Sequence, residues 1–215
     1  MSGKASRAVV RALLDRHGTT YAEEIGIRLR NGPAPLFRLL CASILLSARI
    51  SADLAVKAAR ALADEGWTTP RKLKDAGWER RTRVLNRSGY ARYDERTSRM
   101  LGETAERLLD EYRGDLRRLR DAAERDPAQE RERLKAFKGL GDVGVDIYFR
   151  EAQRVWPELR PFFDGRALEA ARSLGLPSEP DALARLAPRG DVARLAAALV
   201  RTQRAKDRQA VLDAA

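Results

Sequence analysis

The stretch FKGLGDVGVDIYF, residues 137–149, combines features suited to binding an anion. Gly139 and Gly141 flank a leucine at the end of one predicted helix, and a second helix is predicted to begin at Asp142. Glycine permits positive φ in a tight corner and leaves room where the backbone approaches a ligand. Free N–H groups at the start of the second helix favour a phosphate, and Lys138 adds a positive charge. The pattern predicts a phosphate-binding helix–hairpin–helix; the alternative is an ordinary corner between two helices.

The chain contains one cysteine and one histidine, which excludes several kinds of chemistry. Cys41 alone permits neither an internal disulfide nor a cysteine-ligated iron–sulfur or zinc site within one chain. It lies in the apolar pattern LFRLLCASILLSA, which is typical of a buried structural thiol. His17 lies in DRHGTT at a predicted helix end, where we expect it to cap the helix. We therefore expect no metal site.

The composition indicates a globular protein with a polyanionic partner. Of 215 residues, 44% are hydrophobic, enough for a core in one domain or two small ones. The net charge is +11, and 35 of the 42 basic residues are arginine. Arginine makes planar, bidentate contacts with phosphate. The alternative is a solvated surface in an arginine-rich proteome, because charge alone argues only for solubility and non-specific binding.

No apolar run approaches membrane-spanning length, and no N-terminal segment resembles a signal peptide. We therefore expect a cytoplasmic, nucleoid-associated protein without a membrane partner. Nothing predicts a coiled coil or a repeated interface, so we expect a monomer.

Apolar residues recur at helical spacing along the whole chain, and no segment alternates as a strand does. The breaker NGPAP precedes a strongly apolar helix from Leu36 to about Ala48. Ser51 and Gly66 are placed to cap and end the next helix, and Pro127 suits the first turn of a later one. The fold class predicted is all-α, with roughly ten to thirteen short helices.

Four segments, LLCASILLSARIS, NRSGYARYDERTSRML, FKGLG and FFDGR, follow one another within residues 36–177. In this order they resemble the helix–hairpin–helix DNA glycosylases of the endonuclease III superfamily. Residues 137–141 fit the family's L-P-G-V-G hairpin, and Asp164 fits the aspartate that opens a later helix. Arg49 stands where the family's L-S-A-Q carries glutamine. Gly89, Tyr90 and Arg92 fit the G-L-Y-N stretch.

The resemblance implies two helical subdomains with a DNA-binding cleft between them. Residues 34–156 would form a helical barrel that contains the helix–hairpin–helix at about 127–155. Residues 1–33 would pack with a C-terminal subdomain, residues 157–215, which carries Asp164 facing the cleft. The partner implied is double-stranded DNA containing a lesion.

Three departures from the family pattern bear on activity. Members that also cut the strand carry a lysine two residues after the second hairpin glycine, and this chain has Val143 there. Lys135 and Lys138 precede the corner and are poor candidates to replace it. The C-terminal cysteine cluster is missing, and WPELRP at 156–161 looks like an insertion. We expect no lyase activity and no iron–sulfur cluster; the resemblance implies at most a monovalent cation at the hairpin when DNA is bound.

The chemistry that the resemblance leaves to Asp164 is hydrolysis of an N-glycosidic bond. A carboxylate stabilises the positive charge that develops on the sugar and orients or deprotonates the attacking water. One carboxylate suffices when the leaving base is already activated. The alternative role is structural, because FFDGRALEAA places Asp164 just before a helix, where aspartate is a preferred cap. The two roles are compatible.

Reaching a base inside a duplex requires flipping it out, and a side chain must fill the gap. By resemblance this wedge is Arg49, with a second element near Tyr90 and Arg92; a plain surface arginine at a helix end is the alternative for Arg49. The full set of expected DNA-binding residues is Lys138, Gly139, Leu140, Gly141, Val143, Arg49, Tyr90 and Arg92.

Three hypotheses follow for function. The first is a monofunctional DNA repair glycosylase, and the second is a non-catalytic protein of the same fold that recognises bent or damaged duplex. The third is an interaction module without a nucleic-acid partner. The pattern does not identify the lesion.

Overall fold

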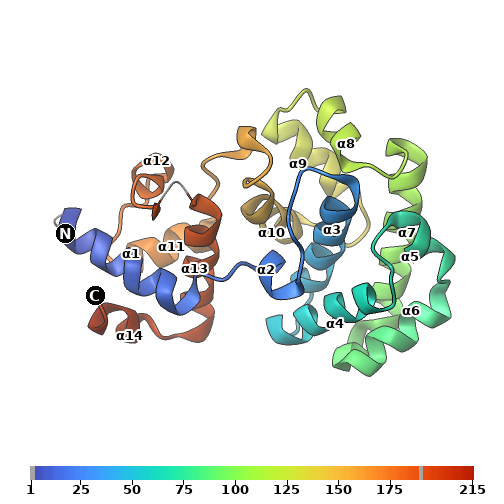
Figure 1. Cartoon of the computed structure of the whole chain (residues 1–215), viewed down its shortest axis with the longest axis horizontal. Helices are drawn as coiled ribbons and strands as arrows, with labels where there is room; N and C mark the ends of the chain where they lie inside the picture. Colours follow the sequence, from blue (N-terminus) through green and yellow to red (C-terminus); the bar gives the residue numbers. More distant parts are fainter. Residues whose placement is uncertain (1–2, 189–190) are drawn as a thin grey trace. The chain divides into compact units, whose positions relative to one another are not determined.

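The computed structural model describes residues 3–188 and 191–215, and those residues form helices joined by short loops, with no strand among them (Figure 1). The prediction of an all-α fold is confirmed. The α-helices are α1 (Gly3–His17), α2 (Tyr21–Ile25), α3 (Pro33–Ser47), α4 (Ala52–Asp64), α5 (Pro70–Asp75), α6 (Trp78–Leu85), α7 (Asp94–Tyr112), α8 (Leu116–Ala122), α9 (Pro127–Lys135), α10 (Asp142–Ala152), α11 (Gly165–Ser173), α12 (Pro180–Ala184), α13 (Val192–Ala205) and α14 (Arg208–Asp213). Short turns of other helical types include η1 (Asn86–Tyr90), η2 (Ala91–Tyr93) and η3 (Pro157–Leu159). Within the described ranges, no helix has the length and apolar character needed to cross a membrane.

The chain divides into two compact units. The terminal unit consists of Met1–Tyr21 and Phe149–Ala215, and the central unit consists of Ala22–Tyr148. The divisions therefore lie at 21/22 and 148/149, whereas the sequence suggested 33/34 and 156/157. Helices α2 and α10 each carry the chain from one unit to the other, so a unit boundary falls inside a helix in both places.

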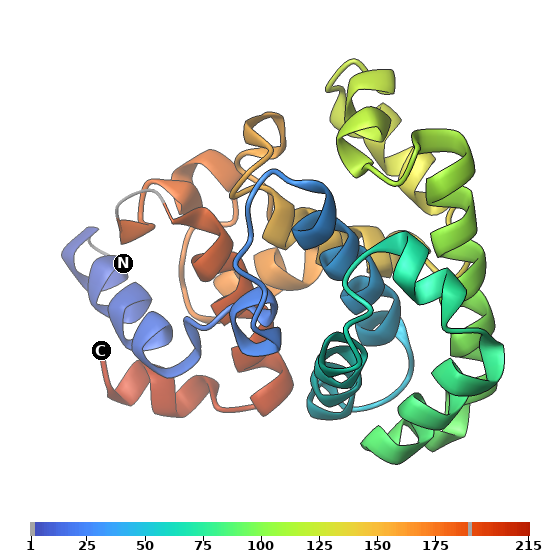
Figure 2. The ribbon, with the colours of Figure 1, turned by 45° about the vertical axis from the view of Figure 1, so that its right-hand side comes forward.

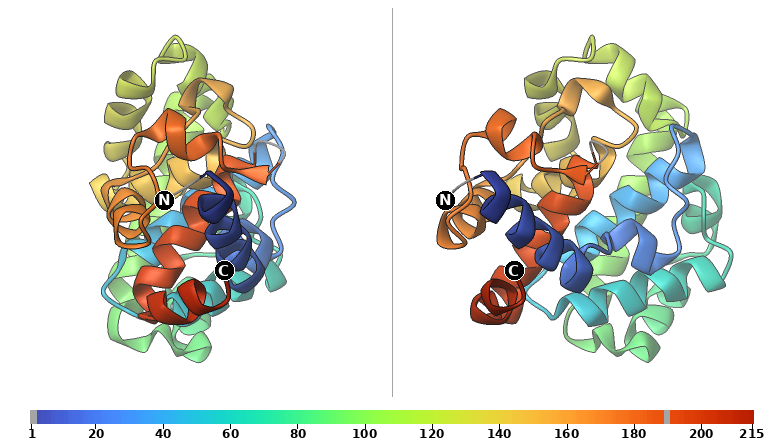
Figure 3. Two further views of the ribbon diagram at one scale, coloured as in Figure 1. Left: turned by 90° about the vertical axis from the view of Figure 1, so that its left-hand side faces the viewer. Right: turned by 60° about the vertical axis from the view of Figure 1, so that its left-hand side comes forward.

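The terminal unit joins the two ends of the chain. Helix α1 packs against α13 and α14, and α13 also packs against α11 (Figure 3). Small and branched apolar side chains fill this core, among them Val10, Leu13, Ala167, Leu195 and Leu199. Because α1 and α13 are far apart in the sequence, this packing fixes the N-terminal helix onto the C-terminal segment that follows Asp164.

The central unit is built around α3, which is apolar on all sides. Every residue from Leu39 to Leu46 is buried, and α3 packs against α4, α7 and α8 (Figure 2). A helix that is hydrophobic all round belongs in the middle of a core. Helix α3 begins at Pro33, three residues before the predicted start, because Pro33 itself occupies the first turn, where proline is tolerated.

Several predicted helix ends are confirmed by their geometry. The Ser51 hydroxyl accepts a hydrogen bond from the Leu54 amide at 3.3 Å, which caps α4. Gly66 has φ +80° just beyond the end of α4, and Pro127 opens α9. His17 differs from expectation, because its Nε2 lies 2.8 Å from an Asp207 carboxylate oxygen instead of capping a carbonyl of α1.

The thiol of Cys41 is inaccessible inside the central unit. It is 6% exposed on α3, and burial raises its pKa to about 12. The thiolate is the reactive form, so the native thiol is expected to be inert. We predict that a thiol reagent labels Cys41 only after denaturant is added, and that the labelling rate follows the unfolding transition. Rapid stoichiometric labelling of the native protein would contradict this placement.

Not all of the arginines form the basic surface. Arg81, Arg120 and Arg150 are buried, at 6%, 7% and 4% exposure. Arg81 donates to the carbonyl oxygens of Leu73 and Ser98, at 2.8 and 3.2 Å, and so joins the end of α5 to α7. Burying a guanidinium requires such partners, and the partner of Arg150 is described below.

Candidate nucleic-acid interface and candidate catalytic carboxylate

Residues 136–141 form a tight hairpin between α9 and α10 in the central unit. The Leu140 amide donates to the Phe137 carbonyl oxygen at 3.0 Å, and Gly139 has φ +86°. Helix α10 then begins at Asp142. The local structure is therefore helix–hairpin–helix, and the first amide groups of α10 lie at an exposed corner.

Glycine stands at the two hairpin positions, 139 and 141, for different physical reasons. A Cβ on Gly139 would lie 2.7 Å from the sulfur of Met100, in a left-handed backbone conformation that other residues rarely adopt. A Cβ on Gly141 would meet nothing within 4 Å. Gly139 is thus required by the fold of the central unit, whereas Gly141 leaves open space at the corner.

The positive charge at the corner comes mainly from Lys138. Lys138 is exposed and has no ion pair among the described residues. Lys135, by contrast, lies 3.3 Å from Asp142 and 3.4 Å from Glu132. Hydrogen bonds to these two carboxylates raise the pKa of the Lys135 amine. Because only an unprotonated amine attacks a sugar aldehyde, this pairing disfavours Lys135 as a nucleophile.

Val143 occupies the first turn of α10 and is 44% exposed. A valine side chain offers the hairpin corner an apolar contact and no nucleophile. The structure thus places an unreactive group where the resemblance would place the lyase lysine.

We predict that borohydride traps no covalent adduct between the native protein and a duplex with an abasic site. Val143 forms no imine, and Lys135 is held protonated by its carboxylate partners. Val143→Lys is the positive control, because it places an exposed amine at this position. An adduct with the native protein that disappears in Lys135→Arg would show that Lys135 reacts after all.

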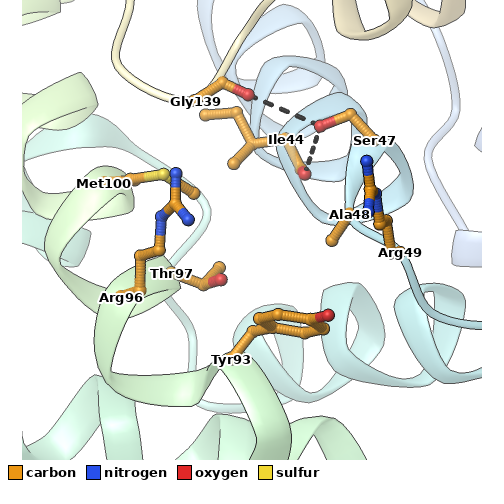
Figure 4. A pocket seen from close by; sticks show the side chains of 9 residues that line it. All are labelled: Ile44, Ser47, Ala48, Arg49, Tyr93, Arg96, Thr97, Met100 and Gly139. Atoms are coloured by element: carbon orange, nitrogen blue, oxygen red, sulfur yellow. Dashed lines mark hydrogen bonds between the residues drawn. The ribbon is translucent and has the colours of Figure 1, made fainter.

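A hollow of about 460 Å³ lies beside the hairpin within the central unit (Figure 4). Its wall is made by the end of α3, the first turns of α7 and the hairpin itself. The nine residues labelled in Figure 4 define it, among them Ser47, Arg49, Tyr93, Arg96, Met100 and Gly139; we call it the hairpin pocket. Three of the four segments quoted for the family resemblance, LLCASILLSARIS, NRSGYARYDERTSRML and FKGLG, therefore each contribute residues to this pocket.

Ser47 joins two of these walls. Its hydroxyl donates to the Ile44 carbonyl oxygen at 2.8 Å and makes a longer contact, 3.4 Å, with the Gly139 carbonyl oxygen. Backbone carbonyl oxygens are among the ligands that hard cations take, and the Gly139 oxygen is one such group at the hairpin. This cation stays a prediction. Among the described residues, no three histidine, cysteine, aspartate or glutamate side chains form a group that could hold a metal ion.

The predicted wedge residues differ in placement. Arg49 is exposed and lines the hairpin pocket, and Arg92 is exposed with its guanidinium 5.4 Å from the centre of the Tyr93 ring. Tyr90 is 1% exposed, and its hydroxyl donates to the Leu45 carbonyl oxygen at 3.1 Å. In this structure the Tyr90 ring is therefore a core group and does not contact a ligand.

Leu140 is also buried, at 1% exposure, so its side chain anchors the hairpin to the core. Only its backbone is placed to approach a phosphate. The aromatic side chain at the pocket is Tyr93, which the sequence analysis missed. The spacing of Tyr93, Arg96, Thr97 and Met100 on one face of a helix is the signal that could have identified it.

Asp164 lies in the terminal unit and caps α11. Its Oδ1 accepts a hydrogen bond from the Ala167 amide at 2.9 Å. Its Oδ2 accepts from Arg150 Nε at 2.9 Å and lies 2.7 Å from Arg150 Nη2. The two side chains are 4% and 3% exposed, which makes this a buried ion pair. Both the expected capping role and an unexpected charged partner are therefore present.

This arrangement limits what Asp164 can do. An ionised carboxylate offers about four acceptor positions, and three are filled, which leaves one on Oδ1. That position belongs to a carboxylate whose side chain is 3% exposed. The two contacts with Arg150 fix the orientation of Asp164 Oδ2. The positive charge of Arg150 also offsets part of the negative charge with which Asp164 would stabilise a positively charged sugar.

The segment WPELRP, residues 156–161, lies in the loop that precedes Asp164. Trp156 is fully buried and precedes η3. The side-chain amide of Gln153 donates to the Phe162 carbonyl oxygen at 3.0 Å and accepts from the Phe162 amide at 3.1 Å. These two hydrogen bonds close the loop that contains residues 156–161 and leads into the capping aspartate; that residues 156–161 are an insertion stays a prediction.

Comparison with protein-family models gives no match for this chain, and comparison with curated proteins gives none. Among solved structures, the chain is similar to endonuclease III in a trapped covalent intermediate with DNA, an estranged-adenine complex. The identity is 17%, the match covers 91% of this chain and 85% of that chain, and the TM-score is 0.47.

Proposed function

We propose that this protein is a monofunctional DNA repair glycosylase that releases a damaged or mismatched base from duplex DNA. The observation that carries the proposal is the meeting of the hairpin, the end of α3 and the start of α7 around one pocket beside exposed positive charges. Phosphate binds at the corner formed by residues 139–142, where free amide groups and Lys138 face solvent. Exposed arginines such as Arg49 and Arg92 hold the backbone of the duplex.

In the proposed reaction, Asp164 positions the attacking water through the open acceptor site on Oδ1. Its charge, shared with Arg150, stabilises the sugar as the bond to the base breaks. No lysine at the position of Val143 attacks the sugar, so the product is an abasic site in an intact strand. The lesion is one whose base is displaced from the stack at low cost, as damaged or mismatched bases are.

A second function, non-catalytic recognition of bent or damaged duplex, is favoured by one specific observation. Asp164 is almost fully enclosed, and three N–H groups already satisfy its carboxylate. Capping α11 and pairing with the buried Arg150 are structural roles that explain an aspartate at position 164 without a catalytic role. In this reading the hairpin and the pocket bind DNA, and no base is released.

DNA binding, which both functions require, is tested by titrating a duplex at several salt concentrations. The logarithm of the binding constant is expected to fall linearly with the logarithm of the salt concentration. Lys138→Gln is expected to reduce the slope by about one, as loss of one phosphate contact does. Absence of binding even at low salt would exclude both functions and favour an interaction module. Release of a free base from a lesion-bearing duplex separates the first function from the second.

A further inference from the structure

One methionine side chain of α7 packs directly against the hairpin. A Cβ added to Gly139 would lie 2.7 Å from the sulfur of Met100 and 2.8 Å from its terminal carbon, so the thioether fills the space beside this glycine. A methyl carbon of Ile44 lies 3.5 Å from the same point. Because Gly139 has φ +86° and forms the tight part of the corner, the position of the hairpin depends on this apolar contact.

The same thioether can be reached by a small molecule. Met100 is half-buried and lines the hairpin pocket, whose volume of about 460 Å³ is far more than a single water needs. Figure 4 shows it on the wall of the pocket that also carries Arg96, beside the segment of Gly139. The sequence contains one other methionine, Met1, and one cysteine, Cys41, which is 6% exposed. Within the part of the chain that the structure describes, the accessible sulfur is therefore that of Met100.

We propose that Met100 is a site of reversible oxidation through which oxidants control the hairpin. A two-electron oxidant such as hydrogen peroxide converts a thioether to a sulfoxide. The sulfur lone pair attacks one peroxide oxygen, so an S–O bond forms while the O–O bond breaks. Sulfur loses two electrons and the peroxide gains them. The departing hydroxide takes the proton of the transferred oxygen and leaves as water.

Oxidation would change the surroundings of Met100 in two ways. The sulfoxide is polar, so its packing against Gly139 and Ile44 would no longer be favourable. Its oxygen is also an acceptor at the i,i+4 spacing from Arg96, and side chains at this spacing are neighbours on a helix. A guanidinium offers donors only, so Arg96 would turn to this oxygen and be less available to a phosphate.

This inference rests on the DNA-binding part of the proposed function and adds a control of it. Both changes would weaken duplex binding at the corner and the pocket. A methionine sulfoxide reductase returns the sulfoxide to the thioether, so the control would be reversible.

The test treats the native protein with dilute hydrogen peroxide, removes the oxidant and follows three quantities. Peptide mass spectrometry gives the fraction of Met100 that is oxidised, and titration gives the affinity for a duplex that carries a tetrahydrofuran abasic analogue. Hydrogen exchange is measured for the amides of residues 137–142 and of α3. We expect the affinity to fall about tenfold in step with the oxidised fraction. The hairpin amides are expected to exchange faster while those of α3 stay slow, and the reductase is expected to restore both properties.

Met100→Leu is the matched control, because leucine has a similar volume and no sulfur. Each protein is compared with itself before and after peroxide, so a change in starting affinity does not affect the result. We expect peroxide to leave the affinity of Met100→Leu unaltered, although Met1 and Cys41 are still present. Met100→Gln places a polar side chain at this position without an oxidant and is expected to reproduce the loss.

Several results would overturn the proposal. One is a Met100 that stays reduced while free methionine in the same mixture is oxidised. Another is an oxidised protein that binds duplex as tightly as before, or an equal loss of affinity in Met100→Leu. Faster exchange throughout α3 would mean general unfolding and would also exclude a local control. If the untreated protein binds no duplex, the DNA-binding function falls, and exchange at the hairpin alone decides whether Met100 controls it.

Discussion

Asp164→Asn is expected to reduce the rate of base release by about 100-fold or more while leaving affinity for a product-analogue duplex unchanged. Removing one group that stabilises developing charge typically costs a factor of this size. Asparagine is also a good cap, so the hydrogen bond from the Ala167 amide is expected to persist. The rate is measured under single-turnover conditions, and the affinity is measured with a tetrahydrofuran duplex.

Stability is the confounding factor in this experiment. Removing one partner of a buried ion pair leaves the other charge uncompensated, at a cost of about 3–5 kcal/mol. The control is Arg150→Gln combined with Asp164→Asn, which removes both charges and is expected to recover much of the lost stability. The double variant is expected to be folded and inactive. Activity equal to that of the native protein in either variant would remove Asp164 from the mechanism.

The second large effect is expected for a substitution in the hairpin, at Gly139. Gly139→Val is expected to lower the free energy of unfolding by about 1–3 kcal/mol, because Gly139 has φ +86°, a left-handed conformation that a β-branched residue rarely adopts. Its Cβ would lie 2.7 Å from the Met100 sulfur, so the flexible Met100 side chain would have to move away from the hairpin. Distortion of the corner is expected to weaken duplex binding at least about tenfold, since the amide groups of α10 would no longer face the phosphate.

Gly141→Ala is the matched variant for this prediction. Gly141 lacks a left-handed φ, and an added Cβ meets nothing within 4 Å, so stability is expected to be near that of the native protein. Its affinity for duplex is nevertheless expected to fall if a phosphate approaches the corner closely. Chemical denaturation and duplex titration of both variants separate the two roles. Native stability in Gly139→Val would contradict the hairpin described above.

Local patterns predicted the helices and their ends well, because these depend on neighbouring residues. Ser51, Gly66 and Pro127 act within one turn of the helix that each begins or ends, and the Gly-Leu-Gly corner is confined to residues 139–141. The central position of α3 followed from its continuous apolar character. His17 was misassigned, since its partner Asp207 lies 190 positions away in the sequence.

The candidate site depended on contacts that no local pattern contains. The hairpin pocket brings Arg49, Arg96 and Gly139 together from three distant segments, and only the fold places them at one hollow. Tyr90 and Tyr93 are three positions apart, and packing decides that the first is buried, with its hydroxyl bonded to the Leu45 carbonyl oxygen, while the second lines the pocket. The pairing of Arg150 with Asp164 joins two helices across a loop whose path the sequence does not reveal.

Base release by a monofunctional mechanism is the central claim, and one assay tests it directly. The native protein is incubated with duplexes that each carry one lesion: uracil, hypoxanthine, an alkylated purine, an oxidised pyrimidine, or adenine opposite oxidised guanine. Each product is analysed with and without hot alkali. We expect strand cleavage of at least one duplex after alkali only, which means that a base was removed and the strand was left intact. Tight binding to several duplexes with no cleavage of any of them, even after alkali, would contradict the claim and identify the protein as a non-catalytic reader of damaged DNA.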